Sequence, residues 1–255
     1  MPLIDDSGYC LGKLPARHLM GLPALSSYTL ALPDAPDAVD WSVGLASFGM
    51  MANDHLGDCT AAAAAHAIQT WTISESGQEE TPSDDEVVEF YSASTGYDPA
   101  DTSTDQGGVE SAVLSYWRRN PIKGHVLDGF VSVNPKSKPT VRDAIWLFGG
   151  AYLGLMLPIS AQRQLVWDVP AEGVTGVGAP GSWGGHAVWA VAYDSRTVTV
   201  VTWGMRKSMT WEFFATYAEE AYALLSPTWT AKDAVSPSGF DFATLQTDLR
   251  EFHNT

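Results

Sequence analysis

Two residues far apart in the chain have the types and neighbours that thiol chemistry requires. Cys59 follows a turn of small and polar residues at positions 53–58 and precedes five alanines at 61–65. Alanine favours helices and Asp58 is a good N-cap residue, so Cys59 should lie on the first turn of a helix. The helix dipole there favours a nucleophilic thiolate, and the alternative is an inert, buried cysteine. Far downstream, His186 follows two glycines and opens an apolar strand, so it can meet Cys59 only through the fold.

The segments around these two residues resemble the papain-like cysteine peptidases. In that family the cysteine begins a long central helix, and the histidine opens a strand within Gly-His-Ala-Val, the sequence found here at residues 185–188. Three more segments follow the family's order: 39–42 resembles the start of the mature chain, 106–108 the glycine pair that binds substrate backbone, and 202–204 the Asn-Ser-Trp-Gly segment. The resemblance covers about residues 39 to 205. It implies an α+β, papain-like fold, in which a helical lobe with a central Cys-bearing helix packs on an antiparallel β-barrel-like lobe.

The resemblance also implies a role for each matching residue. Cys59 is the expected nucleophile and its backbone N–H an oxyanion donor, while His186 holds the thiolate as an ion pair and then protonates the leaving amine. The family's second oxyanion donor is a glutamine six residues before the cysteine, and Asn53 occupies that position with a side chain one carbon shorter. The implied substrate-binding residues are Gly107, Gly108, Gly184, Ala187 and Trp203.

The sequence departs from the family at the residue that orients the histidine. The family's asparagine lies two positions before the tryptophan, and Val201, which cannot hydrogen-bond to an imidazole, stands there instead. Thr202 is the candidate third catalytic residue, and it needs a one-residue shift of strand register to face His186. We expect Val201 to pack against the strand of His186, and Trp203 to cover the edge of its ring.

Composition limits the class of partner. The 255 residues carry a net charge of −16 and a sequence pI near 4.5, which argues against binding to nucleic acid or to an anionic membrane surface. No apolar run approaches the ~18 residues of a membrane-spanning helix. The first residues lack the apolar stretch of a signal peptide, so synthesis in the cytoplasm is the default expectation. The two cysteines are too few for a disulfide framework.

No metal and no cofactor are expected. Asp98, Asp101 and Asp105 share one loop, but their spacing does not match a calcium-binding EF-hand, and we interpret the loop as a solvated acidic segment. The expected partner is a peptide or protein substrate.

The hydrophobic pattern changes its period between the two halves of the chain. It predicts helices at 59 to about 75, 82–95, 108–119 and 140–148, and strands at 126–133, 151–158 and 197–204. A last helix is expected from Thr210 to about residue 225, where the match to the papain pattern ends. We divide the chain into an extended leader (1–40), a two-lobed domain (41–225) and a tail (226–255); the helical lobe covers about 41–119 and the β-rich lobe about 126–225.

Three functions remain open. The first, which we favour, is a papain-like cysteine peptidase with a Cys-His dyad, and the second uses the same dyad on another amide, such as a cell-wall peptide. The third is an inactive papain-like module that serves as a binding or structural component, for example of a phage particle, with residues 1–40 and 226–255 contacting assembly partners. The leader fits a strap across the body, a pro-segment or an attachment arm, and we favour the strap.

Overall fold

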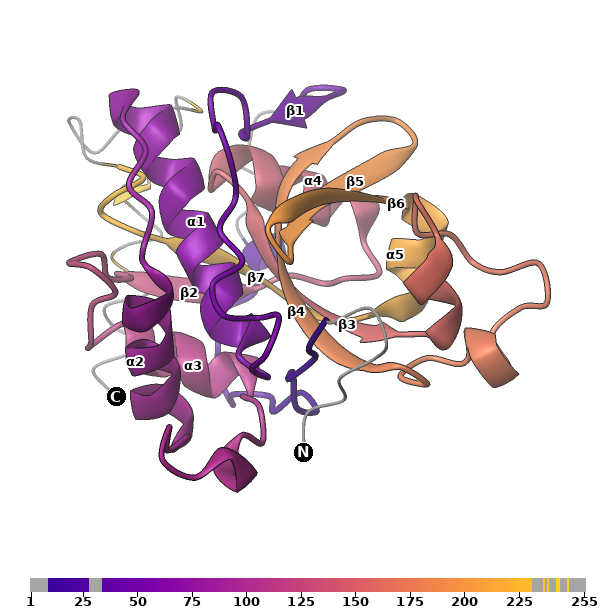
Figure 1. Ribbon diagram of the computed structural model, residues 1–255. Helices are drawn as coiled ribbons and strands as arrows, with labels where there is room; N and C mark the ends of the chain where they lie inside the picture. The colour runs from indigo at the N-terminus through magenta and orange to yellow at the C-terminus, as the bar shows by residue number, and fades with distance from the viewer. Residues whose placement is uncertain are drawn as a thin grey trace.

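Helices occupy the first half of the described chain and strands dominate the second, in an α+β arrangement (Figure 1). The computed structural model describes residues 9–27 and 34–230, together with residues 236, 238, 242, 243 and 247. The first half holds α1 (Cys59–Ser76), α2 (Asp84–Thr95) and α3 (Glu110–Trp117). Within the described residues, no helix is long and apolar enough to span a membrane.

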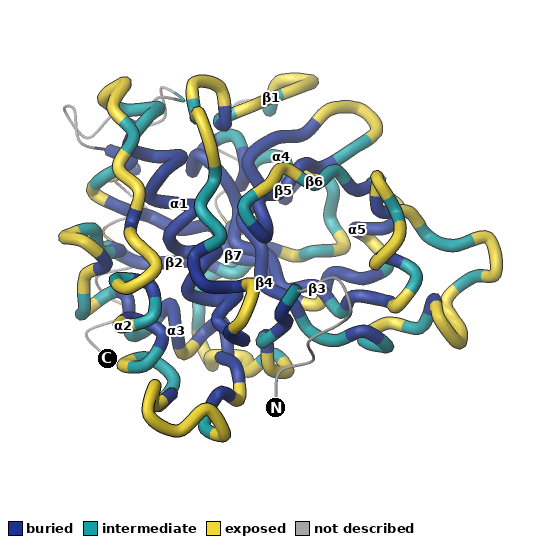
Figure 2. Tube along the Cα trace, in the orientation of Figure 1, coloured by how far each residue is buried: buried dark blue, intermediate teal, exposed yellow. Residues whose placement is uncertain are grey.

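Helix α1 is the central element of the fold. Its alanines have small side chains, so neighbouring elements approach it closely, and residues 59–72 are all buried (Figure 2). α1 packs on α2 and on strand β4 (Gly184–Tyr193). Trp71 joins the two sides, because its ring stacks on Trp117 and meets Trp189 edge-on. Asp58 is the N-cap residue of the helix, as expected, but its side chain caps no backbone N–H.

The strands form one antiparallel sheet. Its hydrogen-bonded order is β2-β7-β3-β4-β5-β6, and the short strand β1 pairs with β4. Strand β4 lies inside the sheet between β3 and β5, and it is buried from His186 to its end. The other elements are β1 (Val39–Asp40), β2 (Gly129–Ser132), β3 (Ala151–Leu157), β5 (Thr197–Thr202), β6 (Met205–Thr210), β7 (Ala218–Leu225), α4 (Lys138–Leu147), α5 (Trp211–Tyr217) and the 3-10 helices η1 (Leu25–Ser27), η3 (Thr102–Thr104), η4 (Ile159–Arg163) and η5 (Gly176–Gly178).

Strand β7 corrects the prediction of a helix that reaches residue 225. Helix α5 ends at Tyr217, and the chain continues at once as β7 between β2 and β3. The segment contains alanine, glutamate and leucine, which favour helices, but seven of its eight residues are buried in the sheet. Burial between two strands outweighs the weak local preference. The chain from residue 218 to residue 225 is therefore a strand and not a helix.

The described part of the leader is a strap that lies against both halves of the body. Ser111 on α3 donates its hydroxyl to the carbonyl of Arg17 at 2.8 Å, and Ser132 on β2 donates its N–H to the carbonyl of Pro23 at 2.9 Å. Leu25 is buried in the core. Most of the predicted tail lies outside the described residues, as do residues 1–8 and 28–33.

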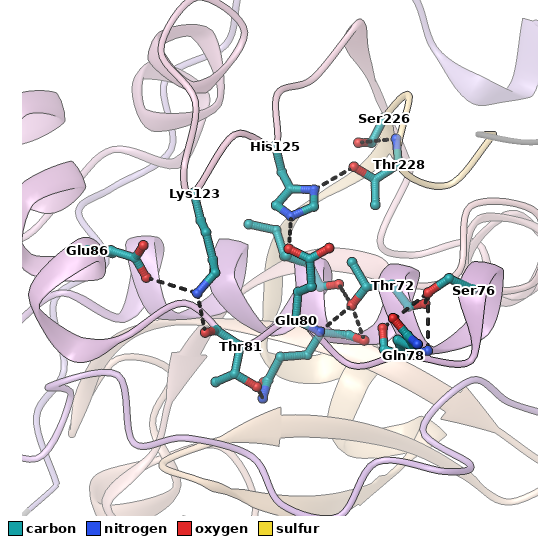
Figure 3. Close-up of polar contacts among 12 residues, drawn as sticks. Thr72, Ser76, Gln78, Glu80, Thr81, Glu86, Lys123, His125, Ser226 and Thr228 are labelled. Carbon is teal, nitrogen blue, oxygen red and sulfur yellow. Dashed lines mark hydrogen bonds and ion pairs between the residues drawn. The ribbon is translucent and has the colours of Figure 1, made fainter.

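Polar contacts tie the first residues of the tail to the helical half (Figure 3). His125 Nδ1 lies 2.8 Å from Thr228 Oγ1, and its Nε2 lies 3.3 Å from Glu80 Oε2. Beside it, Lys123 Nζ donates to the carbonyl of Thr81 at 3.2 Å. These contacts hold the loop after α1 against the connection from α3 to β2, at the end of α1 opposite to its N-terminus.

Candidate active site

Cys59 occupies the first residue of α1, as the sequence predicts, and its side chain is buried. Its Sγ accepts a hydrogen bond at 3.4 Å from the backbone N–H of Ala187, the residue that follows His186 on β4. The N-terminus of α1 and the start of β4 are therefore adjacent. Burial raises the pKa of the Cys59 thiol to about 12, and the neighbouring carboxyl of Asp58 adds to the rise. Desolvation thus outweighs the helix dipole, and Cys59 is a neutral thiol in this structure.

The ring of His186 is held by the end of β5 and the turn that follows. Its Nε2 lies 2.6 Å from Thr202 Oγ1, and Trp203 stacks on its face with ring centroids 4.3 Å apart. We expected Trp203 to cover the edge of the His186 ring. The planes of the two rings lie only 14° apart, so Trp203 covers the face of the ring instead. Among the described residues, His186 Nδ1 has no hydrogen-bond partner. Burial lowers the pKa of His186 to about 3, so the imidazole is neutral.

A bulge in the sheet turns Thr202, and not Val201, toward the histidine. Strand β5 pairs with β4 in a register that shifts between Ala190 and Ala192. After the shift Val201 lies opposite Trp189, which is three residues from His186 and therefore on the other face of β4. The one-residue shift that Thr202 requires is thus present. Val201 is buried, as expected, and its side chain has no polar atom that could hydrogen-bond to the His186 ring.

The loop before Cys59 is held in an unusual backbone conformation. Met51 and Ala52 have φ values of 58° and 64°, the left-handed region that residues with side chains rarely adopt. Asn53 follows them, and its amide Nδ2 donates to the carbonyl of Leu56 at 3.0 Å. That bond uses one of the two amide hydrogens. Burial raises the pKa of the Asp58 carboxyl well above its usual value, and a side-chain hydrogen bond from Asn53 offsets part of this rise. The role of Asn53 as an oxyanion donor stays a prediction.

Asp105 connects the cysteine loop to the glycine pair. One carboxylate oxygen accepts the N–H of Gly57 at 2.9 Å, and the other accepts the hydroxyl of Tyr91 at 2.6 Å. The Tyr91 oxygen in turn accepts the N–H of Gly107 at 3.0 Å. We interpreted Asp105 as part of a solvated acidic loop, and that was wrong, because it is buried and shared between two parts of the site.

The strap occupies the groove where the resemblance places a substrate. Lys13 donates its N–H to the carbonyl of Gly185 at 3.0 Å. On the other side, Gly108 donates its N–H to the carbonyl of Gly12 at 2.8 Å, and Leu14 donates its N–H to the carbonyl of Gly108 at 2.9 Å. Residues 12–14 therefore lie between the glycine pair and the strand of His186. Figure 1 shows this N-terminal segment between the helices and the strands.

Further contacts bind the strap to residues of the predicted catalytic site. Cys10 donates its N–H to the carbonyl of Asn53 at 3.1 Å, and Trp203 Nε1 donates to the carbonyl of Cys10 at 3.2 Å. Tyr9 stacks on the Trp203 ring with centroids 4.5 Å apart. A Cβ on Gly12 would lie 1.7 Å from the carbonyl oxygen of Gly57, so the strap passes too close for any other residue at position 12.

The structure brings together most residues that the sequence singled out. Cys59, Ala187, His186, Thr202 and Trp203 form one cluster, and Gly107 and Gly108 border it across the strap. Gly184 begins β4 and pairs with Leu157 of β3. The sequence did not predict that residues 12–14 bind between Gly108 and Gly185, or that Glu110 and Glu220 are buried beside them. The available signal was Glu110, a charged residue in the otherwise apolar turn that follows the glycine pair. Within the described chain, no cluster of His, Cys, Asp or Glu side chains is arranged to hold a metal.

No model of a known protein family matches the sequence, and no curated protein matches it. Solved structures do match the fold. Xylellain, a cysteine protease from Xylella fastidiosa, superposes with a TM-score of 0.65 at 15% identity, over 84% of this chain and 95% of that chain. Digestive procathepsin L 3 from Tenebrio molitor gives 0.56 at 14% identity, over 83% and 75%. Bromelain from Ananas comosus gives 0.53 at 15% identity, over 74% and 99%. Likeness at this level of identity shows the fold, and the chain has the papain-like fold of these cysteine proteases.

Proposed function

We propose that this chain is a cysteine peptidase that hydrolyses peptide bonds with Cys59 and His186, and that the strap keeps it closed. The observation that carries the proposal is the hydrogen bond from Ala187 N–H to Cys59 Sγ, since it puts the thiol beside the strand that His186 opens. Two further features support it. Thr202 lies within hydrogen-bond distance of one nitrogen of the imidazole, and the other nitrogen has no hydrogen-bond partner among the described residues, so it is not committed to another group.

In the proposed reaction, Cys59 Sγ attacks the carbonyl carbon of a peptide bond. The thiol proton passes to His186 and then to the nitrogen of the leaving amine as the C–N bond breaks. The backbone N–H of Cys59 and the amide of Asn53 stabilise the oxyanion. A water molecule then attacks the thioester, gives its proton back to the sulfur through His186, and releases the acid.

The closed state explains why the two catalytic groups are both neutral. Burial raises the pKa of Cys59 to about 12 and lowers the pKa of His186 to about 3. The strap borders the pair, because Gly12 lies against the cysteine loop at Gly57 and Tyr9 stacks on Trp203, which in turn stacks on His186. When residues 9–14 leave the groove, water reaches both side chains, the pKa values move toward each other, and a thiolate–imidazolium pair forms more readily.

One observation favours the alternative of an inactive module that binds or supports a partner. The strap fills the groove with backbone hydrogen bonds on both sides, as a permanent part of the core would. In that case the neutral pair is the only state of the protein, and the resemblance extends to the fold but not to the reaction.

The two functions differ in the behaviour of Cys59 once the strap is displaced. In Gly12→Ala the new Cβ would lie 1.7 Å from the carbonyl oxygen of Gly57, so the strap must move. Met20→Ala is the matched control, because residue 20 lies in the leader and is 95% exposed. Alkylation by iodoacetamide is followed at each cysteine by peptide mapping: Cys10 reports the release of the strap, and the pH profile of Cys59 reports its thiolate.

For a peptidase we expect Gly12→Ala to label Cys10 rapidly and to give Cys59 an apparent pKa near or below ~7. The same variant should hydrolyse a fluorogenic peptide library, and Cys59→Ala in that background should not. Rapid labelling of Cys10 with a Cys59 pKa above ~8.5 and no hydrolysis would establish the inactive module instead.

A further inference from the structure

The strongest side-chain contact of the strap is made by Lys13, inside a pocket of carboxylates. Its side chain is fully buried, and its Nζ lies 2.9 Å from Glu220 Oε1 and forms an ion pair with Glu219. The same ammonium donates to the carbonyl of Leu14 at 3.2 Å. Burial by itself lowers the pKa of Lys13, but the charges of Glu110 and Glu220 outweigh it and leave the pKa raised.

Three elements form this pocket, and a glycine between them leaves the space that the Lys13 side chain occupies. Glu110 comes from the start of α3, Glu220 from β7, and Gly154 from β3 between them. A Cβ on Gly154 would lie 2.2 Å from Lys13 Cε, 2.7 Å from Glu220 Cγ and 2.8 Å from Glu110 Oε1, so only glycine leaves the space open. Tyr222 donates its hydroxyl to Glu220 Oε2 at 2.6 Å and fixes that carboxylate in place.

Glu110 is the member of the pocket that Lys13 does not satisfy. Its carboxyl group is fully buried, and neither oxygen has a hydrogen-bond partner among the described residues. Burial, followed by the charge of Glu220, raises the pKa of this group well above its usual value. The Lys13 ammonium donates hydrogen bonds to Glu219 and to the carbonyl of Leu14, and it lies within ion-pair distance of Glu220 Oε1, which like the Glu110 oxygens has no hydrogen-bond partner among the described residues. A buried acceptor without a donor is costly, so the pocket is built for a larger set of donors than the strap supplies.

We propose that this pocket is the subsite through which the protein selects its substrate, and that it binds the arginine or lysine side chain of a peptide. The inference rests on the proposed peptidase function, because it takes the strap's groove to be the substrate groove. Lys13 bonds through its backbone to Gly185, while Gly12 lies against the cysteine loop. The strap residue in the pocket is therefore next in sequence to the residue that lies against the cysteine loop.

Arginine fits the unsatisfied carboxylate better than lysine. A guanidinium carries five N–H donors in a planar fork and can bridge two carboxylates, whereas an ammonium has three donors. It would reach both Glu220 and Glu110 and favour the ionised form of Glu110. A neutral side chain would leave buried carboxylates without a cation, which is unfavourable. The expected order of preference is arginine, then lysine, then methionine.

The first test measures hydrolysis by the opened, full-length Gly12→Ala protein. Fluorogenic peptides carry arginine, lysine or methionine at one varied position at a time. We expect one position at which arginine raises kcat/KM over methionine by at least ~10-fold. Glu220→Gln in the same background should lower that arginine-to-methionine ratio by ~10-fold, because a buried charged hydrogen bond is lost. Glu219→Gln is the matched control and should lower it less, since Glu219 is 33% exposed at the rim.

The second test does not depend on activity. Fluorescein-labelled Leu-Gly-Xaa-Leu-Pro amide, the sequence of residues 11–15 with Xaa as arginine, lysine or methionine, is titrated into the Cys59→Ala, Gly12→Ala protein. We expect the arginine peptide to bind at least ~10-fold more tightly than the methionine peptide, and Glu220→Gln to remove most of the difference.

The outcomes separate the two proposals. Binding that prefers arginine without any hydrolysis would support the subsite and overturn the peptidase. Hydrolysis with no preference for a basic residue at any position would support the peptidase and overturn the subsite. Equal binding of the three peptides, or a preference that survives in a Glu110→Gln, Glu220→Gln protein, would also overturn the subsite.

Discussion

Replacing Lys13 with methionine removes the charge that anchors the strap and keeps most of the side-chain volume. The ammonium is fully buried, 2.9 Å from Glu220, and faces the unpartnered carboxylate of Glu110. Removing one partner of a buried ion pair costs ~3–5 kcal/mol. Glu219, the other partner, is 33% exposed and can turn to water. We therefore take the lower end of the range, ~3 kcal/mol, as the loss in docking free energy of the strap.

The chain does not have to unfold to relieve this cost, because the strap can leave the groove. A loss of ~3 kcal/mol raises the population of the open state by ~100-fold. The rate of iodoacetamide labelling at Cys10 and Cys59 should rise by the same factor wherever opening precedes labelling. Labelling is followed over time at a fixed pH, and peptide mapping distinguishes the two sites.

Two variants serve as controls for the Lys13 experiment. Lys13→Arg keeps the charge and should label within a few-fold of the wild type. Lys123→Met removes a lysine that is 38% exposed and far from the groove, and it should leave both rates unchanged. If Lys13→Met labels no faster than the wild type, the ion pairs do not hold the strap and this reasoning is refuted.

Three other predictions follow from the ring contacts and from burial. In the Gly12→Ala background, Thr202→Val should lower kcat/KM by ~10–100-fold with little change in Tm, because His186 loses the hydroxyl at Nε2; unchanged kinetics would mean that another group orients the ring. Val201→Asn should not raise turnover, since Val201 faces Trp189, and a buried unpaired amide should lower the free energy of unfolding in urea by ~1–3 kcal/mol; a rise in turnover would contradict the strand register. His66→Gln should flatten the acid side of the stability profile, because burial lowers the pKa of His66 to about 4 and keeps it neutral in the folded protein. The unfolded chain binds that proton below pH ~6.5, so wild-type stability falls from there toward pH 4 by ~1.4 kcal/mol per pH unit from this residue; parallel urea-unfolding profiles for the two proteins would contradict the assignment.

The sequence alone predicts the parts of the site that have a local cause. The alanine run makes α1 and places Cys59 at its start, and the glycines before His186 mark the beginning of an apolar strand. The need for a shifted register at Thr202 can also be stated from the sequence. The bulge that produces this shift cannot be predicted from the sequence, because it depends on how β4 and β5 pair over their whole length.

The features that the sequence did not predict depend on burial and on pairing between distant residues. The helix dipole predicts a reactive thiol at Cys59, but burial of the side chain raises its pKa and reverses that effect. The segment Ala218–Leu225 has the composition of a helix and becomes a strand because two other strands flank it. Glu110 and Lys13 lie far apart in the chain, and nothing local to either residue shows that they share one pocket.

The strap belongs to the same chain as the groove that it fills, so it acts as a tethered competitor. The hydrogen bond from Ser111 to the carbonyl of Arg17 means that only the residues before position 17 have to swing out. A tether of this length keeps the effective concentration of the strap at the level of ~mM or above. A closed state favoured by ~3 kcal/mol then lowers the apparent kcat/KM for any free peptide by ~100-fold. A single cut between the pocket residue and Arg17 would end the tether's advantage, because the released segment would dilute away and compete only at its own concentration.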